Sequence, residues 1–258
     1  MAYALITGAS KGIGKAIAYN LAMRGYDLIL VARSENLLVE MANELTKKNN
    51  VKVITIALDL SAEKSADTIA RRIEEEQIPL QILVNNAGYG LWGRFDTLTL
   101  SEQEAMMRIN TFTMVKLTYL MLPYLKKQPE SFILNVASTA AYQAVPTLAI
   151  YAASKSFVLQ FTRGLRYELK NSGVSVSCLS PGPTETNFMN AAGMHTPEMI
   201  KRASKFNMPA DVVARIALNS MFKGKVEIIP GFINRLSTWM TYFVPKALTE
   251  KIAAGLYE

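Results

Sequence analysis

The stretch TGASKGIG, residues 7–14, follows a short apolar run and precedes a longer amphipathic one. Its glycines, Gly8, Gly12 and Gly14, have the spacing G-x-x-x-G-x-G, which differs from the common G-x-G-x-x-G fingerprint. Glycines let a backbone approach a pyrophosphate closely, and the amides at a helix N-terminus bind its negative charge. A glycine-rich turn between a first strand and a first helix therefore predicts a dinucleotide-binding βαβ unit.

Short apolar runs alternate with longer amphipathic ones along the chain. Repeated strand-helix-strand patterns predict a parallel sheet covered by helices on both faces, with right-handed crossovers. We expect one α/β domain over residues 1–258, a doubly wound Rossmann-type sheet, because no repeat, low-complexity tract or Pro/Gly linker divides the chain. The expected strands are Ala4–Thr7, Leu28–Ala32, Val51–Ala57, Ile82–Asn85, Phe132–Val136, Val174–Leu179 and Val226–Ile229.

Two long helices are expected in the second half of the fold. Ser101 and Glu104 have the spacing of a capping box, which predicts a helix that starts there and continues to about Lys126. Asn110 falls inside this helix, although Asn is a poor interior helix former. It is either a solvated polar residue, or a deliberate kink or polar site. The next helix is expected over about 149–170.

Composition narrows the class of protein. Half of the 258 residues are hydrophobic and 19% are charged, which permits a sizeable core and argues against disorder. The net charge of +7 suggests anionic partners. Lys and Arg are scattered, however, without a basic run that interleaves aromatics, so nucleic-acid binding is disfavoured. The phosphates of a cofactor or substrate need only a few of these charges.

The chain has one cysteine, Cys178, and one histidine, His195. An intrachain disulfide is impossible, and His-based metal sites or a Ser-His-Asp mechanism are disfavoured, so we expect no metal and interpret His195 as an ordinary surface or loop residue. Acid–base chemistry must then come from Tyr, Lys or carboxylates. The N-terminal residues MAYALITGAS lack the features of a signal peptide, and no apolar stretch approaches the ~20 residues of a spanning helix, which predicts a cytoplasmic protein.

The end of the second expected strand bears on cofactor choice. Enzymes that bind NAD often have an acidic residue about 20 positions after the glycines, where it holds the ribose hydroxyls. This chain has Arg33, and Arg favours a 2′-phosphate. Lys11 adds a second positive charge, although each could be an ordinary surface cation. Together, without a carboxylate at the strand end, they predict NADP(H), with NAD(H) less favoured.

Further along the chain, the segments NNAG (85–88), YAASK (151–155) and PGPTET (181–186) join the glycine turn, and Asp59, Asn110 and Ser138 lie between them. In order and spacing these pieces resemble the classical short-chain dehydrogenases/reductases over roughly residues 3–190. The resemblance implies an alcohol dehydrogenase or carbonyl reductase that interconverts a carbonyl and a secondary alcohol by hydride transfer. It also implies a homodimer or homotetramer, joined through the helices at about 102–126 and 150–170.

The resemblance also selects one Tyr–Lys pair from two. Tyr151 and Lys155 lie four residues apart, on one face of a helix, and Ser138 precedes them by the interval typical of the family. The same spacing in YFVPK, residues 242–246, lacks such a Ser, and Pro245 disrupts its helical spacing.

Roles carried over from the family complete the predicted site. Tyr151 would exchange a proton with the substrate oxygen, and Lys155 would stabilise the phenolate and bind the nicotinamide ribose. Ser138 would orient the substrate oxygen, and Asn110 would hold a water that relays protons to Lys155. The set of predicted catalytic residues is Asn110, Ser138, Tyr151 and Lys155.

The cofactor contacts follow from the same likeness. Asp59 would contact the adenine, although its alternative role is that of a turn or helix-start residue. The backbone near Thr184 and the side chain of Thr186 would hold the carboxamide, and Asn85 is expected to brace the sheet rather than touch the ligand. The predicted cofactor-binding residues are Gly8, Ser10, Lys11, Gly12, Ile13, Gly14, Arg33, Asp59, Asn86, Ala87, Gly88, Tyr151, Lys155, Pro181, Gly182, Thr184 and Thr186.

The substrate end of the chain is less informative. Residues 183–209 are irregular and rich in methionine (Met189, Met194, Met199 and Met208), which predicts either core filling or a mobile lid over a lipophilic ketone, steroid or 3-oxoacyl substrate. A non-catalytic dinucleotide-binding sensor or scaffold is the alternative function. The aromatic tail, residues 232–244, could lie in a lipid interface. A pocket wall or subunit contact is the favoured reading of that tail, so membrane association is not expected.

Overall fold

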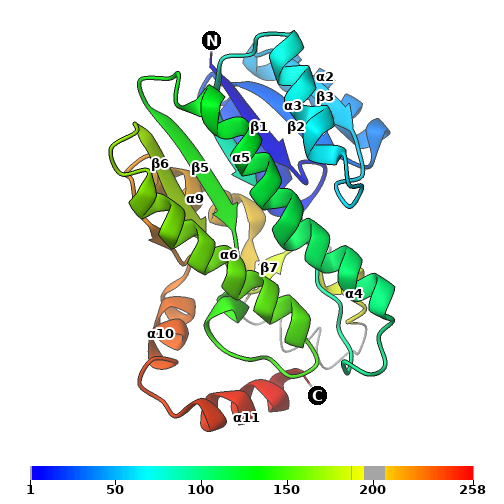
Figure 1. Cartoon of the computed structure of the whole chain (residues 1–258), viewed down its shortest axis with the longest axis vertical. Helices are drawn as coiled ribbons and strands as arrows, with labels where there is room; N and C mark the ends of the chain where they lie inside the picture. Colours follow the sequence, from blue (N-terminus) through cyan, green and yellow to red (C-terminus); the bar gives the residue numbers. More distant parts are fainter. Residues whose placement is uncertain (1, 187, 195–206, 258) are drawn as a thin grey trace.

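The computed structural model describes residues 2–186, 188–194 and 207–257. A parallel sheet of seven strands lies at its centre, in the order β3-β2-β1-β4-β5-β6-β9 (Figure 1). The predicted doubly wound sheet is therefore confirmed. Its strands are β1 (Tyr3–Thr7), β2 (Asp27–Ala32), β3 (Val53–Ala57), β4 (Leu80–Asn85), β5 (Ser131–Val136), β6 (Val174–Leu179) and β9 (Glu227–Ile228).

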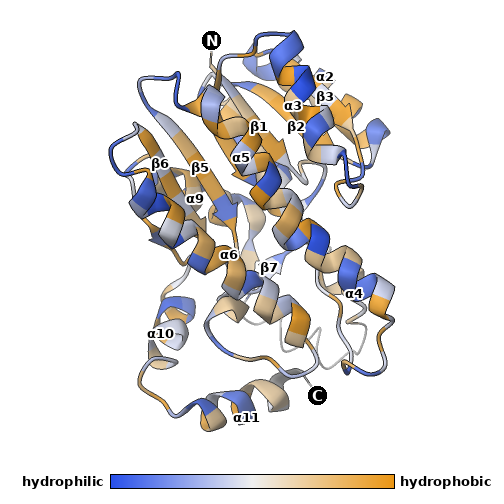
Figure 2. Ribbon diagram, viewed as in Figure 1, coloured by the Kyte–Doolittle hydropathy of each residue, from blue (hydrophilic) through white to orange (hydrophobic). Residues whose placement is uncertain are grey.

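Helices cover both faces of this sheet. One core is formed with α1 (Gly12–Ala22), α2 (Glu35–Asn49) and α9 (Ala210–Met221), and another with α3 (Ser65–Glu75) and α5 (Met114–Leu125). The strands between them are strongly hydrophobic (Figure 2) because both of their faces are buried. The remaining elements are α4 (Leu100–Met107), α6 (Ala149–Glu168), α7 (Phe188–Ala191), α10 (Phe232–Met240), α11 (Lys246–Tyr257) and a strand pair, β7 (Thr184–Glu185) with β8 (Met208–Pro209).

The strand order positions the site. After β1 the chain adds β2 and β3 on one side, then crosses to add β4, β5 and β6 on the other. At such a reversal the connections leave β1 and β4 in opposite directions, which opens a crevice above their carboxyl ends. The glycine turn, residues 7–14, follows β1 and so lies at this crevice.

A buried ladder of polar side chains crosses the sheet beneath the crevice. The Asn85 amide donates to Thr118 Oγ1 at 2.9 Å and to Asn135 Oδ1 at 2.8 Å, and the Asn135 amide donates to Thr162 Oγ1 at 3.0 Å. These contacts join α5, β4, β5 and α6, and all four side chains are buried. The prediction that Asn85 braces the sheet is confirmed.

The single regular helix predicted over residues 101–126 is wrong. Its middle, Arg108–Thr113, is π-helical and separates α4 from α5. The capping box is also displaced by two residues, because Thr99 is the N-cap: its hydroxyl accepts from the Glu102 amide and donates to the Glu102 carboxylate.

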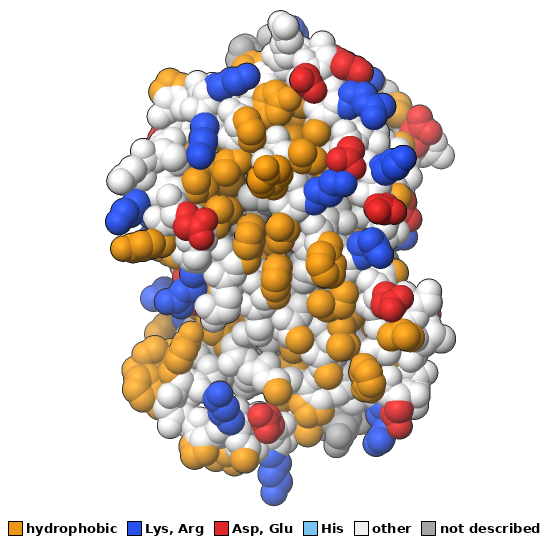
Figure 3. Space-filling model, viewed as in Figure 1, with side chains coloured by type: hydrophobic (Ala, Val, Ile, Leu, Met, Phe, Trp, Pro, Cys, Tyr) orange, Lys and Arg blue, Asp and Glu red, His pale blue; other side chains and the backbone are white. Residues whose placement is uncertain are grey.

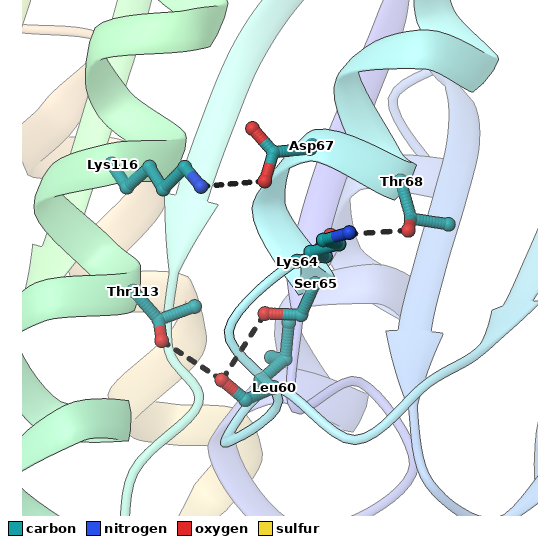
Figure 4. Close-up of polar contacts among 7 residues, drawn as sticks. All are labelled: Leu60, Lys64, Ser65, Asp67, Thr68, Thr113 and Lys116. Carbon is teal, nitrogen blue, oxygen red and sulfur yellow. Dashed lines mark hydrogen bonds and ion pairs between the residues drawn. The ribbon is translucent and has the colours of Figure 1, made fainter.

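The end of the π-helical segment is anchored to the chain that follows β3 (Figure 4). Thr113 Oγ1 donates to the Leu60 carbonyl at 2.8 Å, and Ser65 Oγ donates to the same oxygen at 3.3 Å. One turn further along, Lys116 pairs with Asp67. These contacts hold α3 and α5 together at the level of the crevice.

The ladder beneath the crevice predicts that two alanine substitutions on β5 differ in their effect on the free energy of unfolding. Asn135→Ala should lower the free energy of unfolding by about 2–3 kcal/mol, because it removes two buried hydrogen bonds and leaves an amide and a hydroxyl undersatisfied. Ser131→Ala on the same strand is the control, since its buried hydroxyl has no hydrogen-bond partner in the part of the chain that the structure describes. Equal losses for both variants in urea denaturation would contradict a stabilising role for the ladder.

Candidate active site

The glycine turn is close-packed at each of its three glycines. Gly8 and Gly12 have φ angles of +65° and +55°, which disfavour residues with a Cβ. A Cβ on Gly14 would collide with the Gly8 carbonyl and the Asn86 amide. Lys11 occupies the N-cap of α1, and no side chain among the described residues caps this helix. The first-turn amides therefore remain available for a phosphate group.

Asn86 and Ala87 fasten the end of β4 to this turn. The Asn86 amide donates to the carbonyls of Thr7, at 2.9 Å, and Gly8, at 3.2 Å. The backbone amides of Asn86 and Ala87 both donate to Thr7 Oγ1 at 3.0 Å. These residues lie at the crevice, where the sequence predicts ligand contacts. The structure adds a bracing role that the sequence does not reveal.

Tyr151 and Lys155 lie together on α6, and both are buried. Lys155 Nζ is 5.8 Å from the centre of the Tyr151 ring and donates to the Val136 carbonyl at 3.0 Å. Ser138 follows β5 and caps a short 3-10 turn, Thr139–Tyr142, where its hydroxyl accepts from the Ala140 amide. The competing pair does not share a helix, because Tyr242 lies in the turn after α10, which ends at Met240, and Lys246 is the first residue of α11.

Asn110 is a buried polar anchor, so the polar-site interpretation holds and the solvated one is wrong. Its amide accepts from the Tyr89 backbone N–H at 3.1 Å, and donates to the Tyr89 carbonyl and to Ser154 Oγ, both at 3.0 Å. A Cβ on Gly88 would lie 2.8 Å from Asn110 Oδ1 and 3.2 Å from Lys155 Nζ. Asn110, Lys155 and the chain after β4 therefore meet at one point.

Burial dominates the electrostatics of Lys155. It lowers the pKa of the ammonium to about 8, from an ordinary value of 10.5. The Lys155 side chain is only 5% exposed, and none of the ion pairs between described residues involves it. Because the pKa of the Lys155 ammonium lies close to neutral pH, its protonation state changes readily when a hydrogen-bond acceptor or an anion enters the crevice.

Two of the predicted charged contacts with the cofactor, Arg33 and Asp59, lie at neighbouring strand ends. Arg33 is exposed directly after β2 and forms no ion pair with a described carboxylate. Asp59 Oδ1 accepts from the amide and the hydroxyl of Ser61, which with Arg33 nearby lowers the pKa of the carboxyl. Asp59 thus has the turn role that the sequence left open.

The PGPTET segment closes the crevice from the other side. A Cβ on Gly12 would lie 2.9 Å from Thr186 Cγ2, so Thr186 borders the glycine turn. The Pro181 carbonyl accepts from the Thr139 amide, next to Ser138. Thr184 Oγ1 donates to the Gly182 carbonyl at 2.9 Å. The segment that the sequence assigns to the nicotinamide end therefore joins the glycine turn to the Ser138 segment.

Three residues that the sequence did not single out tie the Ser138 segment in place. Tyr142 Oη donates to Glu227 Oε1 at 2.5 Å, and Arg163 Nη1 of α6 pairs with Glu227 Oε2 at 3.3 Å. The chain after Ser138 and the helix of Tyr151 thus share one carboxylate on β9. A tyrosine four residues after Ser138 was the only local signal, and it does not identify its partner.

The expected lid can be placed only in part. Phe188 packs against α6, with its ring centre 5.4 Å from that of Tyr151, and Gly90 leaves room for both rings. Met189 and Met194 belong to the same apolar cluster as Tyr151, so they fill a core beside the site. His195 and Met199 lie outside the described residues. Within the described residues no group of His, Cys, Asp or Glu is arranged to hold a metal ion.

Comparison with known proteins agrees with this geometry. The family described as short chain dehydrogenase matches residues 2–198. The chain belongs to the short-chain dehydrogenase family. It is 37% identical over 186 residues to sulfoacetaldehyde reductase 2 of Chromohalobacter salexigens, covering 71% of this chain and 73% of that one. It is 30% identical over 246 residues to the very-long-chain 3-oxoacyl-CoA reductase of Mus musculus, covering 93% and 77%.

A solved structure extends the likeness to nearly the whole chain. The short-chain dehydrogenase of Sphingobium yanoikuyae in complex with NADPH superposes with a TM-score of 0.81 at 28% identity, covering 96% of this chain and 98% of that one. The family and these relatives make the protein an oxidoreductase.

The burial of Lys155 predicts a pH-dependent gain in stability on its removal. The unfolded chain keeps this proton to about pH 10, whereas the folded, cofactor-free protein releases it near pH 8. Burial therefore costs stability below pH 8, and the cost fades as the pH rises towards 10. Lys155→Met should raise the free energy of unfolding at pH 7 by up to about 3 kcal/mol, with little gain at pH 10.

Denaturant titrations of the cofactor-free protein at both pH values measure this difference. Lys170→Met, at an exposed position just after α6, is the control and should change stability equally at the two pH values. A pH-independent effect of Lys155→Met would show that burial does not perturb the Lys155 ammonium.

Proposed function

We propose that the protein is an NADP(H)-dependent oxidoreductase that interconverts a carbonyl and a secondary alcohol on a lipophilic ketone, steroid or 3-oxoacyl substrate. The observation that carries the proposal is the convergence of Tyr151, Lys155 and Asn110 next to a glycine turn that leaves helix amides free. Ser138 opens the adjoining segment. The bound dinucleotide would supply or accept the hydride.

Each side chain has a distinct task in this chemistry. Tyr151 donates a proton from its phenol oxygen when a carbonyl is reduced, and takes one when an alcohol is oxidised. Lys155 stabilises the phenolate, since its Nζ lies on the same side of α6 as the Tyr151 ring. Ser138 donates a hydrogen bond to the substrate oxygen, where negative charge develops. Asn110 holds α6 against the chain after β4, which keeps these groups in register.

The preference for NADP(H) rests on charge. Arg33 is exposed at the end of β2 and Lys11 is exposed at the start of α1. A guanidinium without a carboxylate partner suits a 2′-phosphate. The NADPH complex of the Sphingobium yanoikuyae enzyme supports this choice.

The lipophilic substrate class rests on the apolar surroundings of Tyr151. Phe188 and Met194, together with Trp92 and Val145, form the cluster around its ring. Such walls accept bulky apolar groups and leave few polar contacts for a small sugar or acid. The likeness to the very-long-chain 3-oxoacyl-CoA reductase supports an acyl chain as one such group.

A non-catalytic sensor or scaffold is the alternative function, and self-association accompanies either one. Catalysis is favoured because Tyr151 and Lys155 are both retained and in contact. For assembly we propose a homodimer or homotetramer joined through α5 and α6. Large apolar side chains lie exposed along these helices and the π-helical segment (Figure 3), namely Phe112, Tyr119, Phe157 and Tyr167.

Removal of the phenol hydroxyl tests the catalytic role. Tyr151→Phe should lower kcat by about 10²–10⁴-fold, because a positioned general acid contributes roughly this factor, while NADPH affinity stays within about twofold. An NADPH-oxidation screen over ketone, steroid, quinone and 3-oxoacyl substrates provides the assay. Tyr242→Phe, which changes an exposed tyrosine, is the control. Near-normal turnover of Tyr151→Phe would reject Tyr151 as the acid, and activity in neither protein would favour the sensor.

Reversal of the charge after β2 tests the cofactor preference. Arg33→Asp should weaken NADPH binding by about 10–100-fold and leave NADH binding nearly unchanged or improved, because it replaces a charge-assisted bond with repulsion. Arg215→Asp, an exposed position on α9, is the matched control. Unchanged NADPH:NADH selectivity in Arg33→Asp would remove the argument for NADP(H).

A further inference from the structure

Exposed apolar side chains gather on the two C-terminal helices, α10 and α11, which form the lower end of the molecule in Figure 1. Nine of the eighteen large hydrophobic residues that are exposed in the described chain lie between residues 232 and 252, although this segment is less than a tenth of the sequence (Figure 3). We call these nine the C-terminal apolar surface: Phe232, Ile233, Leu236, Trp239, Met240, Tyr242, Phe243, Leu248 and Ile252.

The amphipathic pattern of both helices is inverted. A surface helix of a globular protein normally turns its apolar face inwards. Here α10 buries Thr238 against the protein body, α11 buries Thr249 and Ala253, and the large apolar side chains face outwards. Clusters of large exposed apolar side chains mark binding surfaces.

A close contact ties α10 to the protein body. Asn234 of α10 packs directly on Gly182, where any Cβ would collide with its amide, and its Nδ2 donates to the Pro230 carbonyl at 2.8 Å. The rings of Trp239 and Phe243 contact each other with centres 4.4 Å apart. The Trp239 and Phe243 rings are therefore presented side by side at the end of a helix that packs on the protein body.

Charge distinguishes between the possible occupants. Arg235, Lys246 and Lys251 are exposed among the apolar residues, against Glu250 as the one acidic side chain between residues 231 and 257. A second copy joined by a twofold axis would place the same positive patch against itself. An anionic lipid surface would instead neutralise it. Trp and Tyr side chains are suited to the boundary between headgroups and acyl chains.

We propose that the C-terminal apolar surface docks on an anionic lipid bilayer, with the aromatic side chains in the interface and without crossing it. In the described part of the chain, no helix has the length and apolar character needed to span a bilayer. The sequence alone favoured a pocket wall or subunit contact for this segment, and the outward exposure of its aromatic side chains argues against the pocket wall. The proposal is independent of the catalytic function proposed above.

Vesicle co-sedimentation tests the docking. The full chain is mixed with vesicles of phosphatidylcholine containing phosphatidylglycerol, or of phosphatidylcholine alone. The wild type should bind the anionic vesicles, and more weakly the neutral ones. Trp239→Gln combined with Phe243→Gln should lower the partition coefficient at least about tenfold, because two aromatic side chains no longer bury their area. Phe95→Gln, an exposed phenylalanine elsewhere, is the matched control and should bind like the wild type.

Fluorescence provides a second, local measurement. The chain has two tryptophans, so Trp92→Phe leaves Trp239 as the single reporter. Docking in the interface should shift its emission to the blue on addition of anionic vesicles, and brominated lipids should quench it. Circular dichroism and the thermal unfolding midpoint confirm that each variant is folded, so a loss of binding is not a loss of structure.

Either of two results would overturn the proposal: no vesicle binding by the wild type, or equal binding by the wild type and the double variant. If the wild type does not bind vesicles and the double variant forms a smaller oligomer in analytical ultracentrifugation without lipid, the C-terminal apolar surface belongs to a second copy of the chain.

Discussion

The side-chain amide of Asn110 holds the site together, since it joins three elements at once. It satisfies both backbone groups of Tyr89 after β4 and bonds Ser154 on α6. The π-helical turn places this amide where a regular helix would rotate it away, and such turns are often found at functional sites. Gly88 then fits between Asn110 and Lys155, where no larger residue could. The positions of Lys155 and Tyr151 both depend on this contact.

The burial of Lys155 costs folding stability, and the packing of the core must offset this cost. The buried Lys155 ammonium has one described acceptor, the Val136 carbonyl, and burial weakens its hold on the proton. The ladder of Asn85 and Asn135 is hydrogen-bonded to Thr118 of α5 and Thr162 of α6, so it stabilises a fold that the burial of Lys155 destabilises. The polar groups that cross the sheet thus have a structural role, whereas the buried cation on α6 has the catalytic role proposed above.

The sequence predicted what depends on local pattern and missed what depends on distant partners. The strands follow from apolar runs and could be read directly, whereas the choice of Tyr151 and Lys155 over the second pair at the same spacing required the family resemblance. The break at Asn110 could not, because it requires the Tyr89 backbone to arrive from another element. The capping box was displaced because Thr99 and Ser101 both have suitable chemistry, and only packing distinguishes them. Glu227 was missed for the same reason, since both of its partners are more than sixty residues away in the chain.

The C-terminal helices connect the outer surface of the protein to its cofactor crevice. Asn234 lies on the same helix as Trp239 and packs on Gly182, in the segment that also borders Ser138 and the glycine turn. A shift of α10 towards Gly182 would have to move this segment as well, because their contact has no free space. Under the docking proposal, a lipid surface that holds α10 in place would therefore limit the outward movement of this crevice wall. The close packing of Asn234 on Gly182 thus links the outward-facing helix to the segment proposed to bind the dinucleotide.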